Sequence, residues 1–227
     1  MLDFDDIVAK KEEGNVMSSE QKPRITPSPN GPYIVKSIKK CINKDGAMET
    51  RETMAFCRCG ASKNKPYCDG THAEIGFSSD KLEGRLEDKN ASYKGKKITI
   101  HDNRSVCAHA GYCTDNLASV FRMKKEPWID PDAANVEEII ATIEHCPSGA
   151  LSYTIDEARN NNAEDEPAIL IAPNGPYVVS GSIELSDTTW GEGASRSEFT
   201  LCRCGHSKNK PFCDGTHWYI DFVDENN

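Results

Sequence analysis

The chain has 227 residues, 37% of them hydrophobic, and a formal net charge of −9 at pH 7. Such an acidic chain lacks the basic face that neutralises phosphates, so we expect neither DNA nor RNA as a partner. Because the large apolar residues are thinly spread, we expect several small domains, each stapled by a metal site, rather than one large core.

The ten cysteines are expected to be metal ligands rather than disulfides. Residues 1–26 begin MLDFDDIVAKK and continue into a polar, proline-marked stretch, which is typical of a flexible arm. They lack the basic start and apolar run of a secretory signal, and no stretch of the chain is long and apolar enough to cross a membrane. We therefore expect a soluble protein without membrane association, in the cytoplasm or in the mitochondrial matrix of a eukaryote, where thiols stay reduced.

Two stretches of about fifty residues resemble each other, which indicates an internal repeat. Each starts with PNGPY, at residues 29–33 and 173–177, and runs into a strand of β-branched residues, a polar segment and a second strand. One such half is too small for a core of its own, so we expect the halves to pack on each other as a pseudo-two-fold pair.

Each repeat ends in a cysteine-rich motif, CRCGASKNKPYCDGTH at residues 57–72 and CRCGHSKNKPFCDGTH at residues 202–217. The two cysteines of C-x-C share one face of an extended segment. The Asp-Gly pair after the third cysteine is expected to begin a short helix, which brings the histidine within reach of the same site. The candidate ligands are Cys57, Cys59, Cys68 and His72 in the first motif, and Cys202, Cys204, Cys213 and His217 in the second.

Three thiolates and one imidazole suit two kinds of metal site. Zinc accepts such a set tetrahedrally, but its usual cysteine pairs are spaced C-x₂₋₄-C, and C-x-C is tight for that geometry. In a [2Fe–2S] cluster, the C-x-C pair would bind one iron and the third cysteine with the histidine the other. The imidazole would raise the reduction potential and, on protonation, give a release point for the cluster. A zinc-stapled interaction module without a redox role remains the alternative.

A different module lies between the repeats. Its clearest element is a helix over residues 134–147, because apolar residues recur with helical spacing, Asn135 is a capping residue and Pro147 stops the helix. The other expected elements are a strand at 92–103, a short helix at 113–121, an extended piece at 126–131, a closing strand at 148–155 and a charged linker at 156–167.

This module contains Cys107 and Cys113 in the sequence CAHAGYC and Cys146 in CPSGAL. Three thiolates fit a [3Fe–4S] cluster directly, whereas a [4Fe–4S] cluster needs a fourth ligand, for which His109 is the nearest candidate. The alternative is a domain that has lost its cluster and merely buries its cysteines. Three residues outside all of these patterns are expected to be structural: Cys41, His101 and His145.

Both cysteine-rich motifs resemble the CDGSH iron–sulfur family, whose pattern is C-x-C, then Ser or Thr, Pro, and C-D-G-[STA]-H. Ser62 and Pro66 of the first motif, and Ser207 and Pro211 of the second, stand at the family's Ser/Thr and Pro positions. The resemblance implies a [2Fe–2S] cluster with three Cys ligands and one His in each motif, a β-rich cap, and a role in electron or cluster transfer. Residues 94–154 in turn resemble the single-cluster ferredoxins with C-x₅-C and a distant Cys-Pro.

The two motifs also differ around the histidine ligand. Trp218 follows the second histidine where Ala73 follows the first, and His206 replaces Ala61. A bulky ring and an extra imidazole change solvent access and hydrogen bonding, and both of these tune the potential of a cluster. We therefore expect the two CDGSH sites to titrate at separable potentials.

These observations predict an α+β fold, with two CDGSH-type β-rich repeats packed as a pseudo-two-fold pair and a small α+β ferredoxin-like domain between them. The expected cofactors are two [2Fe–2S] clusters and one [3Fe–4S] or [4Fe–4S] cluster. We find no nucleophile–base pair, phosphate loop or nicotinamide fingerprint, and so expect a monomeric electron carrier or cluster-transfer protein, not an enzyme, whose partner is a redox protein or an apo cluster acceptor. The expected domains are 1–26, a flexible arm; 27–80, the first CDGSH domain; 81–160, the ferredoxin-like domain; and 161–227, the second CDGSH domain.

Overall fold

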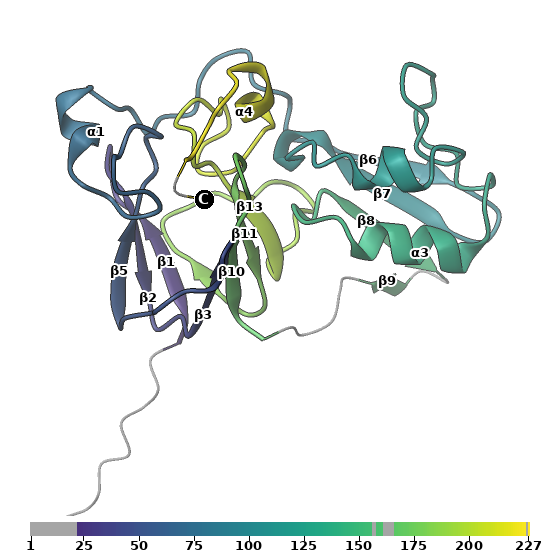
Figure 1. Cartoon of the computed structure of the whole chain (residues 1–227). Helices are drawn as coiled ribbons and strands as arrows, with labels where there is room; N and C mark the ends of the chain where they lie inside the picture. Colours follow the sequence, from purple (N-terminus) through teal and green to yellow (C-terminus); the bar gives the residue numbers. More distant parts are fainter. Residues whose placement is uncertain (1–21, 156–157, 161–165, 226) are drawn as a thin grey trace, which may run out of the picture.

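The computed structural model describes residues 22–155, 158–160, 166–225 and 227. It is a mixed α/β structure made mostly of short strands in three sheets (Figure 1). The strands of the first repeat are β1 (Arg24–Pro27), β2 (Tyr33–Lys36), β3 (Lys40–Asn43), β4 (Gly46–Ala47) and β5 (Thr53–Phe56). Those of the second are β10 (Ala168–Ile171), β11 (Tyr177–Ser180), β12 (Glu184–Leu185) and β13 (Glu198–Leu201).

Most of the arm expected at residues 1–26 lies outside the described residues, but its last part does not match the expectation. Residues 24–26 belong to β1, because Ile25 is a core residue with only 1% of its surface exposed. The first repeat therefore begins before residue 27, the boundary that the proline-marked sequence suggested.

The two repeats exchange strands. One sheet has the order β12-β1-β2-β5 and the other β13-β11-β10-β3-β4. Strand β12 of the second repeat pairs in parallel with β1, with Glu184 opposite Arg24. Strand β3 of the first repeat pairs in parallel with β10, with Lys40 opposite Ala168. Arg24 and Ala168 stand at equivalent positions of the two repeats, as do Lys40 and Glu184, so the exchange is reciprocal.

A single hydrophobic core joins both sheets. The rings of Tyr33 and Tyr177 meet edge to face inside it, with their centroids 6.0 Å apart. The hydroxyl of Tyr33 donates a hydrogen bond to the carbonyl of Cys202 (3.0 Å), and that of Tyr177 donates to the carbonyl of Cys57 (2.9 Å). Each tyrosine therefore holds the cysteine loop of the other repeat, and neither loop is fixed by its own repeat alone.

The middle module has a sheet of order β6-β7-β8-β9 and a core of its own. The helix expected at 134–147 is confirmed: it is α3 (Val136–Glu144), and the side chain of Asn135 caps it by accepting a hydrogen bond from the Glu138 amide (2.8 Å). The remaining elements are β6 (Asn90–Lys94), β7 (Thr99–Asn103), β8 (Leu151–Ile155), β9 (Ala158–Asn160), α2 (Tyr112–Asn116) and a 3₁₀ turn (Arg104–Val106).

Three expectations for this module were wrong in detail. The single strand expected at 92–103 is the hairpin β6–β7, because the chain turns where the Gly95 amide bonds to the Ile98 carbonyl (2.9 Å). The helix expected at 113–121 ends at Asn116, since Phe121 instead forms a β-bridge with Ile129. Part of the charged linker expected at 156–167 is strand β9, which pairs with β8.

Two further helices are very short: α1 (Thr71–Glu74) and α4 (Thr216–Tyr219), each following the cysteine loop of its repeat. Figure 1 shows α1 and α4 beyond the same end of the two neighbouring sheets, and the middle module at the side of the second repeat. In the described ranges no helix has the length and apolar run needed to span a membrane.

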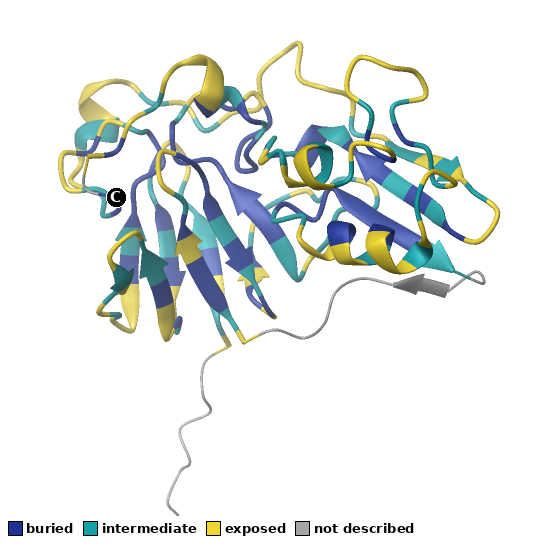
Figure 2. Cartoon of the chain, turned by 45° about the vertical axis from the view of Figure 1, so that its right-hand side comes forward, coloured by how far each residue is buried: buried dark blue, intermediate teal, exposed yellow. Residues whose placement is uncertain are grey.

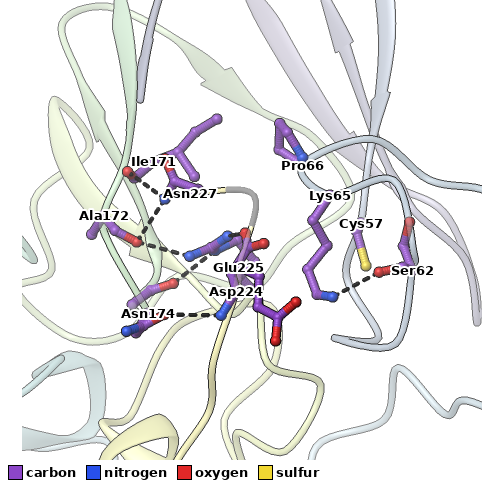
Figure 3. A network of polar contacts seen from close by, with 12 residues as sticks. Cys57, Ser62, Lys65, Pro66, Ile171, Ala172, Asn174, Asp224, Glu225 and Asn227 are labelled. Carbon is purple, nitrogen blue, oxygen red and sulfur yellow. Dashed lines mark hydrogen bonds and ion pairs between the residues drawn. The ribbon is translucent and has the colours of Figure 1, made fainter. Parts of the chain in front are cut away.

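The C-terminal residues join the β3–β4 hairpin to the second repeat, and Figure 3 shows their contacts with Ile171, Ala172 and Asn174 of the second repeat. The Asn227 side chain donates to the Ile171 carbonyl (3.0 Å) and accepts from the Lys44 amide (3.1 Å), so one residue joins β10 to the β3–β4 hairpin of the other repeat. Beside it, the Asp224 amide donates to the Asn174 side chain (2.9 Å).

A fully buried ion pair anchors the same region. The guanidinium of Arg203, between the two cysteines of the second C-x-C pair, bonds to the Asp224 carboxylate and donates to the carbonyls of Gly175 and Ala172, each at 2.8 Å. Because neither charge of the pair has access to water, the remaining charge would be uncompensated if one partner were removed.

We expect Asp224→Ala to lower the stability of the protein by about 3–5 kcal/mol, the cost of leaving a buried charge unpaired. The measurement is the urea midpoint of tryptophan fluorescence. The control is Asp80→Ala, which removes an exposed carboxylate bonded to the Ser78 hydroxyl. Equal midpoints for the two variants would contradict the role assigned to the Arg203–Asp224 pair.

Candidate metal centres

The loop that carries the cysteines is fixed by a small network of hydrogen bonds. The Ser62 hydroxyl donates to the Tyr67 carbonyl (2.6 Å) and accepts from the Asn64 amide (3.1 Å), and the Asp69 carboxylate accepts from the Lys63 amide (2.8 Å). The second motif repeats every contact: Ser207 to Phe212 (2.7 Å), Asn209 to Ser207 (3.0 Å) and Lys208 to Asp214 (2.8 Å). The serine and aspartate of the motif are therefore loop staples.

The Asp-Gly pair begins a short helix, as expected. Gly70 is the N-cap of α1 and adopts a left-handed φ of 93°, which favours glycine. Asp69 precedes it and accepts hydrogen bonds from the amide and the hydroxyl of Thr71, at 3.1 and 2.7 Å. Hydrogen bonds from the amide of Lys63 and from Thr71 hold the pKa of Asp69 well below its usual range.

The candidate ligands of each CDGSH motif lie in two pairs. In the first motif the sulfur atoms of Cys57 and Cys59 are 3.8 Å apart, and Cys68 Sγ is 3.3 Å from His72 Nδ1. Two thiolates bound to one tetrahedral metal at about 2.3 Å lie about 3.8 Å from each other. In the second motif the sulfurs of Cys202 and Cys204 are also 3.8 Å apart, and Cys213 Sγ is 3.4 Å from His217 Nδ1.

Over the described residues, no three His, Cys, Asp or Glu side chains converge closely enough to hold one metal ion. The donor atoms come together two at a time, which suits a cluster with two irons and two protein ligands on each. The residues present thus fit a [2Fe–2S] cluster with three thiolates and one imidazole.

One thiol of each C-x-C pair loses its proton easily. The hydrogen bond from Cys59 lowers the pKa of Cys57 to about 6, although burial opposes this effect. In the second motif the hydrogen bond from Cys204 lowers the pKa of Cys202 to about 7, again against burial. In each pair the hydrogen bond favours the thiolate form of one cysteine, and metal binding also requires the other thiol to lose its proton.

The two CDGSH sites differ in burial. Cys68 and His72 are half-buried, whereas Cys213 and His217 have exposed fractions of only 1% and 5%. Burial lowers the pKa of His217, and the ring of Trp218 lies 5.1 Å from its ring. In Figure 2 the buried residues lie mainly along the strands, and the exposed residues lie mainly in the loops and short helices beyond them. Nearly identical motifs thus stand in different surroundings.

The third candidate site lies in the middle module. Cys107, Cys113 and Cys146 line one cavity of about 870 Å³, and His109 lines it too. Burial raises the pKa of Cys107 to about 11, while the guanidinium of Arg104 donates to its sulfur across 3.7 Å. Three thiols and a nearby cation around one cavity fit an iron–sulfur cluster, whose thiolates need charge compensation.

Asp102 and Arg104 are site residues that the sequence reasoning missed. Both line the cavity, and the carboxylate of Asp102 is buried, with only 1% of the residue exposed. Burial raises the pKa of Asp102 to about 6, against the opposing effect of Arg104, whose Nε lies 4.0 Å away. The sequence contained a clue to Asp102. Ile98, Ile100 and Asp102 are alternate residues that face the buried side of a strand, and a carboxylate is seldom buried there unless it has a specific role.

Cys41, His101 and His145, which were expected to be structural, make their contacts outside the three candidate metal sites. Cys41 is buried in β3 opposite Ile169. The ring nitrogens of His101 lie 2.8 and 2.6 Å from hydroxyl groups of the neighbouring strands. His145 stacks on the ring of Tyr112, with the ring centroids 4.6 Å apart.

Family models match most of the folded chain. A model described as "Iron-binding zinc finger CDGSH type" matches residues 30–73 and 174–218. Another, described as "Divergent 4Fe-4S mono-cluster", matches residues 93–156 between them. These ranges contain all three of the candidate ligand sets.

Several curated proteins are similar to parts of the chain. "Uncharacterized protein YjdI" of Escherichia coli K12 is 41% identical over 61 residues, which are 27% of this chain and 80% of that protein. The "CDGSH iron-sulfur domain protein" of Drosophila melanogaster is 43% identical over 42 residues, which are 18% of this chain and 32% of that protein. The "CDGSH iron-sulfur domain-containing protein 2 homolog" of Drosophila grimshawi matches to the same extent.

No solved structure matches the chain. The two CDGSH matches, the divergent single-cluster match between them and the related CDGSH proteins nevertheless agree with the ligand pairs that the fold brings together. The chain therefore carries two CDGSH-type iron–sulfur domains around a divergent 4Fe–4S single-cluster domain, and it binds iron–sulfur clusters.

Proposed function

We propose that this protein is a one-electron carrier with a [2Fe–2S] cluster in each CDGSH motif and a [3Fe–4S] or [4Fe–4S] cluster in the middle module. The observation that carries the proposal is that one folded chain brings three cysteine ligand sets together around a shared core. Cys107 and Cys146 of the middle module pack against the same core that holds the strands of both repeats.

The chain's own residues suit electron transfer. A bound iron–sulfur cluster supplies a reversible one-electron couple. The tyrosine hydroxyls that bond to the Cys57 and Cys202 carbonyls keep both C-x-C pairs in place, so the ligands need not rearrange when the charge changes. Burial of the four CDGSH thiols in these pairs excludes water. Arg104 donates to the Cys107 sulfur, which favours the reduced, more negative state of the middle site.

The reciprocal exchange of β3 and β12 supports a further proposal about architecture. The two repeats form a pseudo-two-fold pair, in which each supplies one strand and one tyrosine hydroxyl to the other. Such internal pairing gives the chain a partner within itself, and we propose that it works as a monomer.

Cluster transfer to an apo acceptor is the second candidate function. It is favoured by the half-buried state of Cys68 and His72, because an acceptor has to reach the ligands that it replaces. The proposed partner is accordingly a redox protein or an apo cluster acceptor with a basic docking face, since the chain carries a net charge of −9. Nucleic acid and membrane partners do not fit this charge, and the proposed compartment is the cytoplasm or the mitochondrial matrix.

The deciding measurement is the content of iron, zinc and acid-labile sulfide in protein purified without oxygen. We expect about seven or eight irons per chain, the sum of two [2Fe–2S] clusters and one larger cluster. About four irons would mean an empty middle module, and zinc without sulfide would replace the redox proposal by a zinc-stapled interaction module.

Single substitutions assign the iron to the sites. Cys57→Ser and Cys202→Ser should each remove about two irons per chain. Cys113→Ser should remove about three irons if the middle cluster is [3Fe–4S] and about four if it is [4Fe–4S]. The matched control is Cys41→Ala, which alters the one cysteine outside the three ligand sets and should remove none. Iron loss in the control as large as in the ligand variants would contradict the assignment.

His72→Cys and His217→Cys test the ligand set of each CDGSH cluster. Replacing a neutral imidazole by a thiolate adds negative charge to the cluster and should lower its reduction potential. In a spectroscopic redox titration, each variant should shift the wave of its own CDGSH cluster and leave the wave of the other CDGSH cluster unchanged. The two waves can be told apart because the two sites differ in burial and are expected at separable potentials. A shift of both waves, or of neither, would contradict the proposed ligands.

A further inference from the structure

The middle module covers one of the two CDGSH turns and leaves the other open. The ring of His109 lies directly on Gly215: a Cβ atom at that glycine would be 2.5 Å from His109 Cδ2 and 3.0 Å from Cγ. At Gly70, the equivalent glycine of the first motif, a Cβ atom would meet nothing within 4 Å. Among the described residues, the glycine of this sequence is thus in contact with His109 in the second repeat, while the matching glycine of the first repeat faces open space.

His109 reaches Gly215 through an unusual backbone conformation. Its φ is 55°, in the left-handed region that non-glycine residues seldom adopt, and Gly111 follows with a φ of 83°. Both residues lie in the loop between Cys107 and Cys113. A backbone in this region persists where surrounding contacts hold it, and the glycine turn of the second motif is one contact of the His109 side chain.

The His109 ring stands between two ligand sets. On one side it lines the cavity of Cys107, Cys113 and Cys146. On the other it touches Gly215, whose amide donates to the Cys213 sulfur across 3.5 Å. The ring and one glycine thus separate the middle cavity from a ligand of the second CDGSH site.

Two hydrogen bonds also hold the second cysteine loop against the chain segment that contains the middle module. The Asn209 side chain in the second cysteine loop donates a buried hydrogen bond of 2.7 Å to the Ser105 carbonyl. The Lys208 carbonyl of the same loop accepts from the Leu82 amide (2.9 Å). The position of His109 therefore follows from the packing of the whole module on the second motif.

The second motif also touches the first. A Cβ atom at Gly60 would collide with the Cys204 carbonyl, and one at Gly205 with the Cys59 carbonyl. The second motif therefore lies between the middle module and the first motif, whose ligands Cys68 and His72 are the more exposed.

We propose that His109 is the positioning residue that joins the middle site to the second CDGSH site, and that one electron passes between them at this contact. The first motif is then the outer site, open to an external partner. The step makes and breaks no bond and requires no proton: a low-potential one-electron donor reduces the chain, and the second site gains the electron that the middle site loses. This inference rests on the proposed carrier function.

The test compares Gly215→Ala with Gly70→Ala in cluster-loaded protein. Both glycines have a left-handed φ, 79° and 93°, so the backbone cost is shared and the difference reports the His109 contact. His109→Ala removes the ring, and His109→Phe restores a ring of similar size. Each variant is mixed with substoichiometric dithionite, frozen at increasing times and followed by electron paramagnetic resonance, and its iron content and potentials are measured.

Gly215→Ala and His109→Ala should slow the arrival of the electron at the second site several-fold and move the potential of that site, with full iron content. His109→Phe should recover most of the rate, and Gly70→Ala should change neither quantity at the second site. Three clusters with unchanged kinetics in His109→Ala would overturn the relay alone. Loss of the middle cluster in His109→Ala would overturn it by making the histidine a ligand. A wild-type chain with about four irons would overturn both the relay and the three-cluster function.

Discussion

The structure depends on a crossed pair of buried hydrogen bonds, from the hydroxyls of Tyr33 and Tyr177 to cysteine carbonyls of the opposite repeat. A carbonyl inside a core needs a partner, because leaving it unsatisfied costs about 1–3 kcal/mol. The ligand loop of each repeat is therefore complete only when the other repeat is folded beside it. This constraint gives a physical reason for the presence of two motifs in one chain.

Strand exchange extends the same dependence to the sheets. The edge of one sheet is finished by β12, which has only two residues, and the other sheet by the β3–β4 hairpin. The C-terminal Asn227 then bonds to both the exchanged hairpin and the strand beside it. Short strands of this kind have little stability by themselves, and they form here because the shared core supplies the apolar face.

The sequence was sufficient for the features that are local. The motif spacing predicted the cysteine pairs, and helical periodicity with Asn135 predicted α3. The exchange of β3 and β12 could not be read in the same way, because the partner of a short polar strand is decided by tertiary packing. Nor could the sequence distinguish Gly70 from Gly215, since both stand in the same five-residue context. Their difference comes from His109, which is far away along the chain.

The two CDGSH motifs have nearly the same sequence but different surroundings, and this difference suits them to different proposed roles. Solvent access and hydrogen bonding set the potential of a cluster and also control who can reach its ligands. His217 is covered by the fold, with Trp218 beside it and His109 on Gly215, so it is less accessible to another protein than the half-buried His72. The two proposed functions, electron relay and cluster donation, therefore need not compete for one site: the covered motif suits the proposed relay, and the open motif suits contact with the proposed partner.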